Sequence, residues 1–368
     1  MSFLTTHTTH TTHTTHTTHA GAGGGDSSIS SASAAEGLTS SLIGLRHWEM
    51  DGQERAVAAT PLRAGKRDGF GEKGVLPKDA EQRFFGTEAL PRAYVCNSEL
   101  MDQVKFVQID DNTGSITTDG NKVIVKFTRP GFDVFESQLE TVHALSSLRA
   151  RRAAEILPQV YPADAWWASM LGLRPDRFRG TLEFLDVALN FTVTVVFRFK
   201  QMFGCPRPFE YSAAIQPLIP TPGHDSWPSG HATESFLQAR ILAILSQKSL
   251  SGGASAETLL LQNAERIARN REIAGVHFPA DSVAGCILGD TLARFIISYS
   301  AGDGTGMALT REFDAVSHYE DKKDKEDSLL DLAVVSNEKE ALWSAFPNRP
   351  PHHAYMQWMW ARAQAEWL

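Results

Sequence analysis

The sequence Pro228-Ser229-Gly230-His231 comes directly before the apolar run Ala232–Gln247, whose spacing predicts a helix. Ser229 is a natural N-cap residue, and Gly230 lets a ligand approach the backbone without an intervening side chain. The free N–H groups at a helix N-terminus form a ready site for an anion. His231 follows in the first turn and would face the same site. Helix capping explains the serine but not the neighbouring histidine.

A segment upstream, Lys200-Gln-Met-Phe-Gly-Cys-Pro-Arg207-Pro208, adds two positive charges. Lys200 falls near the C-terminal end of a long apolar helix, which Gly204 and Pro206 should end. Arg207 stands between two prolines, so we expect it on a stiff loop. Taken alone, this segment is also explained by a lysine and an arginine at the end of a helix, where positive charges are favoured.

The third segment begins at Arg271 and continues to His277 and Asp281. In one continuous helix, Arg271 and His277 would point roughly 240° apart, at about 100° per residue. Gly275 and Pro279 predict instead that one helix ends and another begins between them, so that the two side chains can converge. Because His277 and Asp281 are four residues apart, the carboxylate can orient the imidazole.

Taken together, the three segments contain a set of residues that helix capping does not explain. Two arginines and a lysine carry positive charge, and no acidic residue in these segments pairs with all of them. Guanidinium groups suit tetrahedral oxyanions, and the serine hydroxyl and the glycine N–H add neutral donors. Two histidines remain, one for attachment to the central atom and one for proton transfer. The residues therefore predict a site for phosphate or vanadate.

Hydrophobic periodicity predicts a mainly α-helical catalytic domain over residues 131–368. Its long helices are predicted over Val134–Leu157, Arg177–Phe203, Ser229–Gln247, Ala256–Ala274 and Pro279–Ser300. The preceding region, residues 41–130, is expected to be irregular with one small β-hairpin, formed by Val104–Ile109 and Asn121–Thr128 around a turn at Asp110–Gly120. The tryptophan-rich stretch from Tyr355 to Leu368 should dock onto the domain or onto a second subunit. In the second case the protein would be a homo-oligomer.

Residues 1–40 have low complexity. Histidine recurs at every third position from His7 to His19 among threonines, and a stretch of Gly, Ala and Ser follows. Such a segment cannot bury enough apolar surface to fold, so a disordered tail without a catalytic role is expected. Loose metal chelation and an added tag are the alternatives.

The composition argues against several classes of protein. A formal net charge of -8 without a compensating basic tract argues against nucleic-acid binding. Cys96, Cys205 and Cys286 form neither a CxxC pair nor a disulfide framework, which favours a reducing compartment. The N-terminus has no secretory signal, and the most apolar stretch, Leu182–Phe199, contains charged residues and therefore predicts a buried helix. A soluble, cytoplasmic protein without a membrane span is expected.

The joint pattern K-x6-RP, PSGH and R-x5-H resembles that of one superfamily. This superfamily joins the vanadate-dependent haloperoxidases with the type 2 phosphatidic acid phosphatases (PAP2) and the bacterial class A acid phosphatases. The resemblance covers roughly residues 165–300 and implies the helical-bundle fold of these enzymes. One departure is Asn270, where the family often has serine; this position is not one of the oxyanion ligands.

The resemblance also implies a role for each motif residue in a haloperoxidase. His277 would be the axial ligand of vanadium, with Asp281 as its orienting partner. His231 would be the acid–base catalyst, and Lys200 would also polarise the bound peroxide. The groups that would hold the equatorial oxygens are Lys200, Arg207, Ser229, the Gly230 N–H and Arg271. In a phosphatase, His277 would instead attack a phosphoester to form phosphohistidine, and His231 would protonate the leaving group.

Fold and motif alone do not separate these two chemistries. Two observations favour the haloperoxidase. The sequence shows no membrane spans like those of the lipid phosphatases. It also shows neither the signal peptide nor the short length of the class A acid phosphatases. A third feature is His224, seven residues before His231. It matches a histidine of the bromoperoxidases, where chloroperoxidases carry phenylalanine; a solvated loop histidine is the alternative. An imidazole at this position would change its charge between about pH 5 and 8.

The prediction is therefore an enzyme that oxidises bromide and iodide with hydrogen peroxide to hypohalous acid, with a small organic molecule as the acceptor of the halogen. Its expected cofactor is orthovanadate, without haem or flavin. One alternative is an acid phosphatase of the PAP2 superfamily that vanadate inhibits. The other is a non-catalytic protein that only binds an oxyanion.

Overall fold

The computed structural model describes Phe84 and residues 87–160, 164–247, 253–301, 310–321, 327–334 and 355–368. The tail predicted over residues 1–40 lies outside these residues, as does the first part of the region 41–130. The helices and strands described below belong to a unit of the chain that contains Ala89–Leu368.

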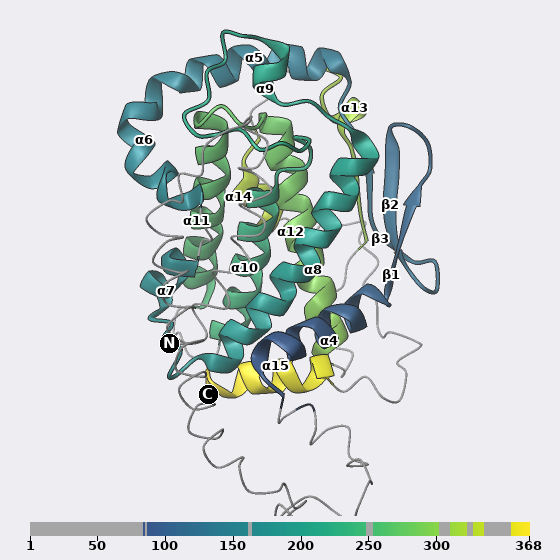
Figure 1. Ribbon diagram of the computed structural model, residues 1–368, viewed down its shortest axis with the longest axis vertical. Helices are drawn as coiled ribbons and strands as arrows, with labels where there is room; N and C mark the ends of the chain where they lie inside the picture. Colours follow the sequence, from purple (N-terminus) through teal and green to yellow (C-terminus); the bar gives the residue numbers. More distant parts are fainter. Residues whose placement is uncertain are drawn as a thin grey trace, which may run out of the picture. The chain divides into compact units, whose positions relative to one another are not determined.

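Long helices run side by side and form the body of this unit (Figure 1). They are α8 (Arg179–Phe203), α10 (Gly230–Ser246), α11 (Gly253–Ile273) and α12 (Pro279–Ala301). Helix α10 packs against the other three, so it has buried residues on every face and lacks the polar stripe of a surface helix. The mainly helical fold predicted from the sequence is confirmed, and these four helices begin and end within a few residues of their predicted bounds.

Helices α10 and α12 approach each other closely because α12 carries glycine where they meet. A Cβ atom on Gly285 would lie only 2.7 Å from the carbonyl oxygen of Ser229, and a Cβ on Gly289 would collide with Thr233. Without these side chains the first turns of the two helices come into contact, and the Ser229 N–H donates to the Asp281 carbonyl at 3.0 Å. The close approach thus joins two of the predicted site segments.

A small sheet accompanies the helices. Its strands are β1 (Val104–Gln108), β2 (Thr113–Thr118), β3 (Val123–Thr128) and β4 (Arg311–Asp314), in this spatial order. The first three are antiparallel, and β4 pairs in parallel with β3. The prediction that Asp110–Gly120 is only a turn is wrong, because it contains β2. That strand is short and mostly threonine, serine and glycine, so its sequence shows no apolar alternation.

The single helix predicted over Val134–Leu157 is also wrong. The chain forms α5 (Phe132–Leu145), a 3-10 turn at Ser146–Leu148, α6 (Arg149–Ile156) and a second 3-10 turn, η2, at Pro158–Val160. A serine hydroxyl interrupts the helical pattern at the first break, where Ser147 Oγ donates to the Ala144 carbonyl. In Figure 1, α5 and α6 turn over one end of the bundle, next to α9 (Pro208–Tyr211).

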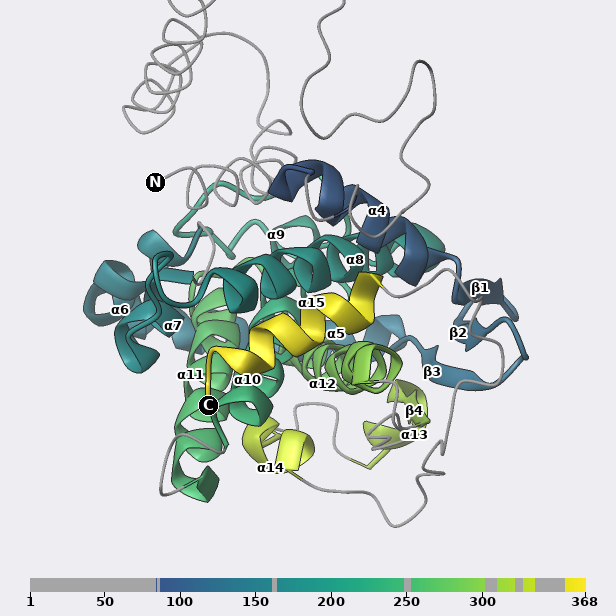
Figure 2. The same cartoon turned by 90° about the horizontal axis from the view of Figure 1, so that it is seen from below.

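The opposite end of the bundle is covered by α4 (Ala89–Met101) and α15 (Tyr355–Ala365) (Figure 2). Trp360 of α15 packs on Phe184 with ring centroids 5.1 Å apart, and Trp367 packs on Phe178 at 4.8 Å. The predicted docking of the C-terminal tryptophans onto the domain is therefore confirmed. Three shorter helices complete the described elements: α7 (Asp164–Leu171), α13 (Ala315–His318) and α14 (Leu329–Val334).

Within the described residues, one helical stretch, Arg179–Tyr211, is long and apolar enough to cross a membrane by length and composition alone. Of its most apolar window, 72% is buried inside the structure. Core helices pass the same test, so this property is weak evidence for a membrane span.

Candidate active site

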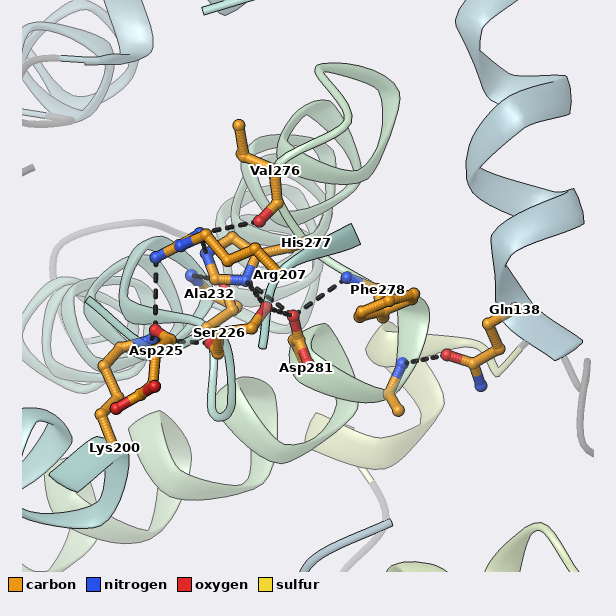
Figure 3. A network of polar contacts seen from close by, with 12 residues as sticks. Gln138, Lys200, Arg207, Asp225, Ser226, Ala232, Val276, His277, Phe278 and Asp281 are labelled. Carbon is orange, nitrogen blue, oxygen red and sulfur yellow. Dashed lines mark hydrogen bonds and ion pairs between the residues drawn. The ribbon is translucent and has the colours of Figure 1, made fainter. Parts of the chain in front are cut away.

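The helices that carry the predicted site residues meet at the end of the bundle where α8 and α11 end and where α10 and α12 begin (Figure 1). Lys200, Arg207, His277 and Asp281 lie close together there (Figure 3). Lys200 lies in the last turn of α8, which stops at Gly204 in a left-handed conformation with φ 57°. Ser229 is the N-cap of α10, and Arg271 lies in the last turn of α11. The N-termini of α10 and α12 add positive dipole ends to this region.

Lys200 is buried, with a relative exposure of 2%, and its ammonium group is held by main-chain carbonyls. Nζ donates to the carbonyl of Asp225 at 2.7 Å and to that of Ser226 at 2.6 Å (Figure 3). Burial and the neighbouring Arg207 lower the pKa of Lys200 well below its usual value. Its charge is thus placed by the loop that precedes α10.

Arg207 is held in the same manner. Its Nε donates to the His224 carbonyl at 2.8 Å, and its Nη1 donates to the Val276 carbonyl at 2.7 Å. The carboxylate of Glu210 accepts from the backbone N–H of Arg207 at 2.6 Å. Burial lowers the pKa of Arg207 to about 10, so the group stays positive near neutrality.

Arg271 has the least compensated charge of the motif residues. Its Nη2 donates to the Ile156 carbonyl at 3.0 Å and to Gln159 Oε1 at 3.2 Å. Its Nε and Nη1 are buried and have no hydrogen-bond partner among the described residues. Burial lowers its pKa to about 9. Since buried donors without acceptors are costly, this side chain fits a site that is completed by an oxyanion.

His277 and Asp281 form the predicted imidazole–carboxylate pair. His277 Nδ1 lies 2.8 Å from Asp281 Oδ2, which assigns the proton to Nδ1 and leaves the lone pair on Nε2. Nε2 lies 3.4 Å from Arg207 Nη1. Burial, Arg207 and Lys200 lower the pKa of His277 well below its usual value, so the ring is neutral. A neutral imidazole with an oriented lone pair can bind vanadium or attack phosphorus.

The carboxylate of Asp281 organises the loop around His277. Oδ2 also accepts from Ser226 Oγ and from the Phe278 N–H, the latter at 2.9 Å (Figure 3). Burial raises the pKa of Asp281 to about 6. The sequence did not single out Ser226, whose hydroxyl also lies 3.3 Å from His277 Nδ1, because a hydroxyl in a loop has many ordinary uses.

Ser229 and Gly230 begin α10 as predicted. Ser229 is fully buried, and its Oγ accepts from the Ala232 N–H at 3.4 Å. The hydroxyl of Ser229 donates to no acceptor in the part of the chain that the structure describes, so its hydrogen is available to a ligand. The Gly230 N–H stands at the first helical position, where no acceptor exists within the helix.

His231 is fixed by the η2 turn. Its Nε2 lies 3.0 Å from the main-chain carbonyl of Gln159, so Nε2 carries the hydrogen and Nδ1 carries the lone pair. Burial and Arg271 lower the pKa of His231 to about 3. The ring is therefore neutral near pH 7 and can accept a proton.

His224 also joins the site. Its Nδ1 lies 3.2 Å from Arg207 Nη2, and its ring meets Phe197 edge-on with centroids 4.9 Å apart. Burial, Lys200 and Arg207 lower the pKa of His224 to about 3. The expectation that this imidazole changes charge between pH 5 and 8 is therefore wrong, because burial and the neighbouring cations keep it neutral throughout that range.

The assembled site is rich in fixed positive charge and in neutral imidazoles, with Asp281 as the carboxylate paired to His277. Nowhere in the described part of the chain do three or more His, Cys, Asp or Glu side chains cluster in a way that could hold a metal cation. The donors suit an anion with several oxygens.

A comparison with protein families agrees with this geometry. The family model of the PAP2 superfamily matches residues 184–303, which include every motif residue described above. The match supports the assignment of this domain to the superfamily, whose members are generally enzymes, either phosphatases or haloperoxidases. No curated protein matches the chain.

Proposed function

From the premise of a PAP2-superfamily domain, we propose that this protein is a vanadate-dependent haloperoxidase that oxidises bromide and iodide with hydrogen peroxide. The observation that carries the proposal is the charge arrangement around His277. Lys200, Arg207 and Arg271 are buried, and their hydrogen bonds go mostly to main-chain carbonyls. Two donors of Arg271 have no partner among the described residues. Such a site favours a multiply charged oxyanion.

Vanadate fits this donor set. His277 Nε2 would bind vanadium, and the oxygens would be held by Lys200, Arg207, Ser229, the Gly230 N–H and Arg271. When bound, vanadate would supply a Lewis acid that activates hydrogen peroxide toward a halide. Asp281 keeps His277 in the tautomer that presents Nε2.

His231 would move the proton in this reaction. Because its Nε2–H is used by the Gln159 carbonyl, Nδ1 is the atom that would accept a proton from the incoming peroxide. Burial and Arg271 lower the pKa of His231 to about 3 in the anion-free site, so Nδ1 carries no proton near neutrality. A bound oxyanion, vanadate or phosphate, would raise this pKa toward the range in which the ring exchanges protons, because it offsets the neighbouring cations.

His224 supports the choice of a haloperoxidase. A phosphohistidine mechanism uses two imidazoles, one as nucleophile and one as acid. This site has a third one, in contact with the guanidinium that also meets His277. A neutral imidazole next to that cation can bind peroxide or position a halide.

A phosphatase is the second candidate, and the His277–Asp281 pair is the observation that favours it. His277 Nε2 could attack phosphorus, forming an N–P bond while the ester P–O bond breaks. The leaving oxygen would then take a proton from His231. The dianionic substrate would raise the pKa of His231 while it is bound, because it offsets the cations that lower this pKa.

The two functions separate in one pair of assays on protein freed of phosphate. With orthovanadate, hydrogen peroxide and bromide, we expect bromination of an organic dye. Without vanadate, we expect little hydrolysis of p-nitrophenyl phosphate. Hydrolysis that vanadate inhibits, without bromide oxidation, would establish the phosphatase. Phosphate binding without either activity would leave an oxyanion-binding protein.

Replacement of the central imidazole tests the attachment point. His277→Ala should abolish vanadate-dependent bromination and leave the circular dichroism spectrum unchanged. His143→Ala, at an exposed histidine of α5, is the matched control and should retain full activity. Full bromide oxidation by His277→Ala would exclude the proposed vanadium ligand.

A further inference from the structure

Gln159 is a buried residue of the η2 turn, with a relative exposure of 2%, and it contacts three residues of the site region. Its Oε1 accepts from Asn270 Nδ2 at 2.8 Å and from Arg271 Nη2 at 3.2 Å. Its main-chain carbonyl lies 3.0 Å from His231 Nε2. One residue outside all three motifs therefore bonds both the uncompensated guanidinium and the proton-transfer imidazole.

We propose that Gln159 is a positioning residue of the oxyanion site, which holds Arg271 with a neutral acceptor so that its full positive charge remains for the anion. The inference rests on the oxyanion site of the proposed function and applies equally to a haloperoxidase and to a phosphatase.

The neutrality of this acceptor is the central point. A buried arginine is usually held by a carboxylate, which cancels its charge. Arg271 has an amide oxygen and a main-chain carbonyl instead, from Gln159 and Ile156. Both acceptors engage Nη2, while Nε and Nη1 have no partner among the described residues. The group is thus oriented at one nitrogen and left to bind at the other two.

Asn270 explains how the amide of Gln159 is itself oriented. The shorter of the two bonds to Oε1 comes from Asn270 Nδ2, which also lies 3.3 Å from Glu155 Oε2. The asparagine at the position where the family often has serine therefore supplies an amide donor to this contact. Because Asn270 and Arg271 are adjacent in α11, two side chains from the last turn of this helix donate hydrogen bonds to Gln159 Oε1.

A glutamate at position 159 tests the proposal because it keeps the shape and the acceptor but adds a charge. In Gln159→Glu we expect a higher Tm for the anion-free protein, since the buried guanidinium gains a carboxylate. Binding of inorganic phosphate and of orthovanadate, titrated calorimetrically on the full chain, should weaken by roughly tenfold to a hundredfold, the scale of a bond to a charged group.

Two further variants separate positioning from a structural role. Gln159→Met removes the acceptor and should also weaken phosphate binding, because Arg271 is no longer oriented. Gln238→Glu is the matched control: this buried glutamine of α10 accepts from Trp167 Nε1 at 2.8 Å, away from the site. Its phosphate affinity should stay within about twofold of the unmodified protein.

Turnover gives the second readout. The contact to His231 uses the main chain, which the substitutions retain, so at saturating vanadate the rate should fall less than the affinity. If both Gln159 variants bound phosphate as tightly as the unmodified protein, or lost only Tm, the inference would be overturned. If the unmodified protein bound neither phosphate nor vanadate, the proposed function would fail together with it.

Discussion

Among the described residues, Asp281 makes its side-chain hydrogen bonds through one oxygen, Oδ2, which meets His277 Nδ1, Ser226 Oγ and the Phe278 N–H. An asparagine in its place offers one acceptor oxygen without charge, so His277 loses its fixed tautomer. We expect Asp281→Asn to lower vanadate or phosphate affinity, or activity, by about tenfold to a hundredfold, the usual cost of losing such an orienting partner.

Isothermal titration with phosphate and bromination at saturating vanadate would measure this effect. Asp331→Asn, at an exposed aspartate of α14, is the matched control. Unchanged affinity and activity in Asp281→Asn would show that His277 needs no carboxylate to hold its orientation.

A second residue-scale prediction concerns halide choice. Nδ1 of the neutral His224 lies 3.2 Å from Arg207 Nη2. A phenylalanine at position 224 would deprive Arg207 of this polar contact and would exclude water from the site. A drier site strengthens the field of the cations at the peroxide, and chloride needs the more strongly activated peroxide. The unmodified protein should therefore oxidise bromide and iodide with little chloride activity, and His224→Phe should gain chloride activity.

Rates with all three halides between pH 5 and 8 test this prediction. Since burial and the cations lower the pKa of His224 to about 3, the halide preference should not change with pH through this residue. Efficient chloride oxidation by the unmodified protein would contradict the assignment, and so would an unchanged halide profile in His224→Phe.

At this scale the sequence predicted which side chains meet, but not what holds them. Lys200, Arg207 and Arg271 are recognisable by their spacing to Ser229 and His277. Their acceptors are mostly main-chain carbonyls, and a carbonyl looks the same at every residue. For this reason the contact of Gln159 with His231, which is made through the backbone of Gln159, could not be predicted from the sequence.

At the scale of elements, long helices were predictable where their ends have chemical markers. α8 ends at Gly204, α10 begins after Ser229, and α12 begins at Pro279, and each marker acts through local backbone conformation. Strand β2 and the break between α5 and α6 had no such marker. β2 is stabilised by pairing with β1 and β3, which a local pattern does not contain.

The N-terminus of α8 is capped by a residue near the C-terminus of the chain. The N-cap of α8, Phe178, has no side-chain acceptor, and Glu366 takes its place by accepting from the N–H groups of Gly180 at 2.5 Å and of Thr181 at 2.7 Å. Glu366→Ala should lower the free energy of unfolding by about 1 kcal/mol, the usual value of a helix cap.

Urea denaturation monitored by circular dichroism would measure this loss. Gln364→Ala, at an exposed position in the last turn of α15 just before Glu366, is the control and should change stability by less than about 0.5 kcal/mol. Halide oxidation by the native form should be unchanged in both, since α15 lies at the opposite end of the bundle from the site. Equal stability of the two variants would rule out the cap.

At the scale of the whole molecule, the site makes stability depend on pH. Burial and nearby cations lower the pKa values of His224, His231 and His277 in the folded state, so the unfolded chain binds their protons first as the pH falls below about 6.5. Asp281 and Asp225 act in the opposite sense, because burial raises the pKa of both carboxyl groups, that of Asp281 to about 6. With three imidazoles against two carboxyl groups, the free energy of unfolding of the anion-free protein should fall between pH 7 and pH 5.

The slope amounts to about 1.4 kcal/mol per pH unit for each net proton taken up on unfolding. Urea denaturation at several pH values would measure it. His231→Gln should flatten the curve, whereas His143→Gln, at the exposed histidine of α5, should leave it unchanged. A free energy that rises as the pH falls from 7 to 5 would show that the imidazoles are not held neutral.

The main-chain carbonyls that hold the cations have a consequence for motion. A carboxylate can leave its partner by rotation of its own side chain, but a main-chain carbonyl moves only with its peptide unit. Lys200 and Arg207 are bound to carbonyls of residues 224–226 and 276, and Arg271 to that of Ile156. Rearrangement of the charged groups therefore requires several loops to shift together, and collective motions of this kind take on the order of microseconds to milliseconds.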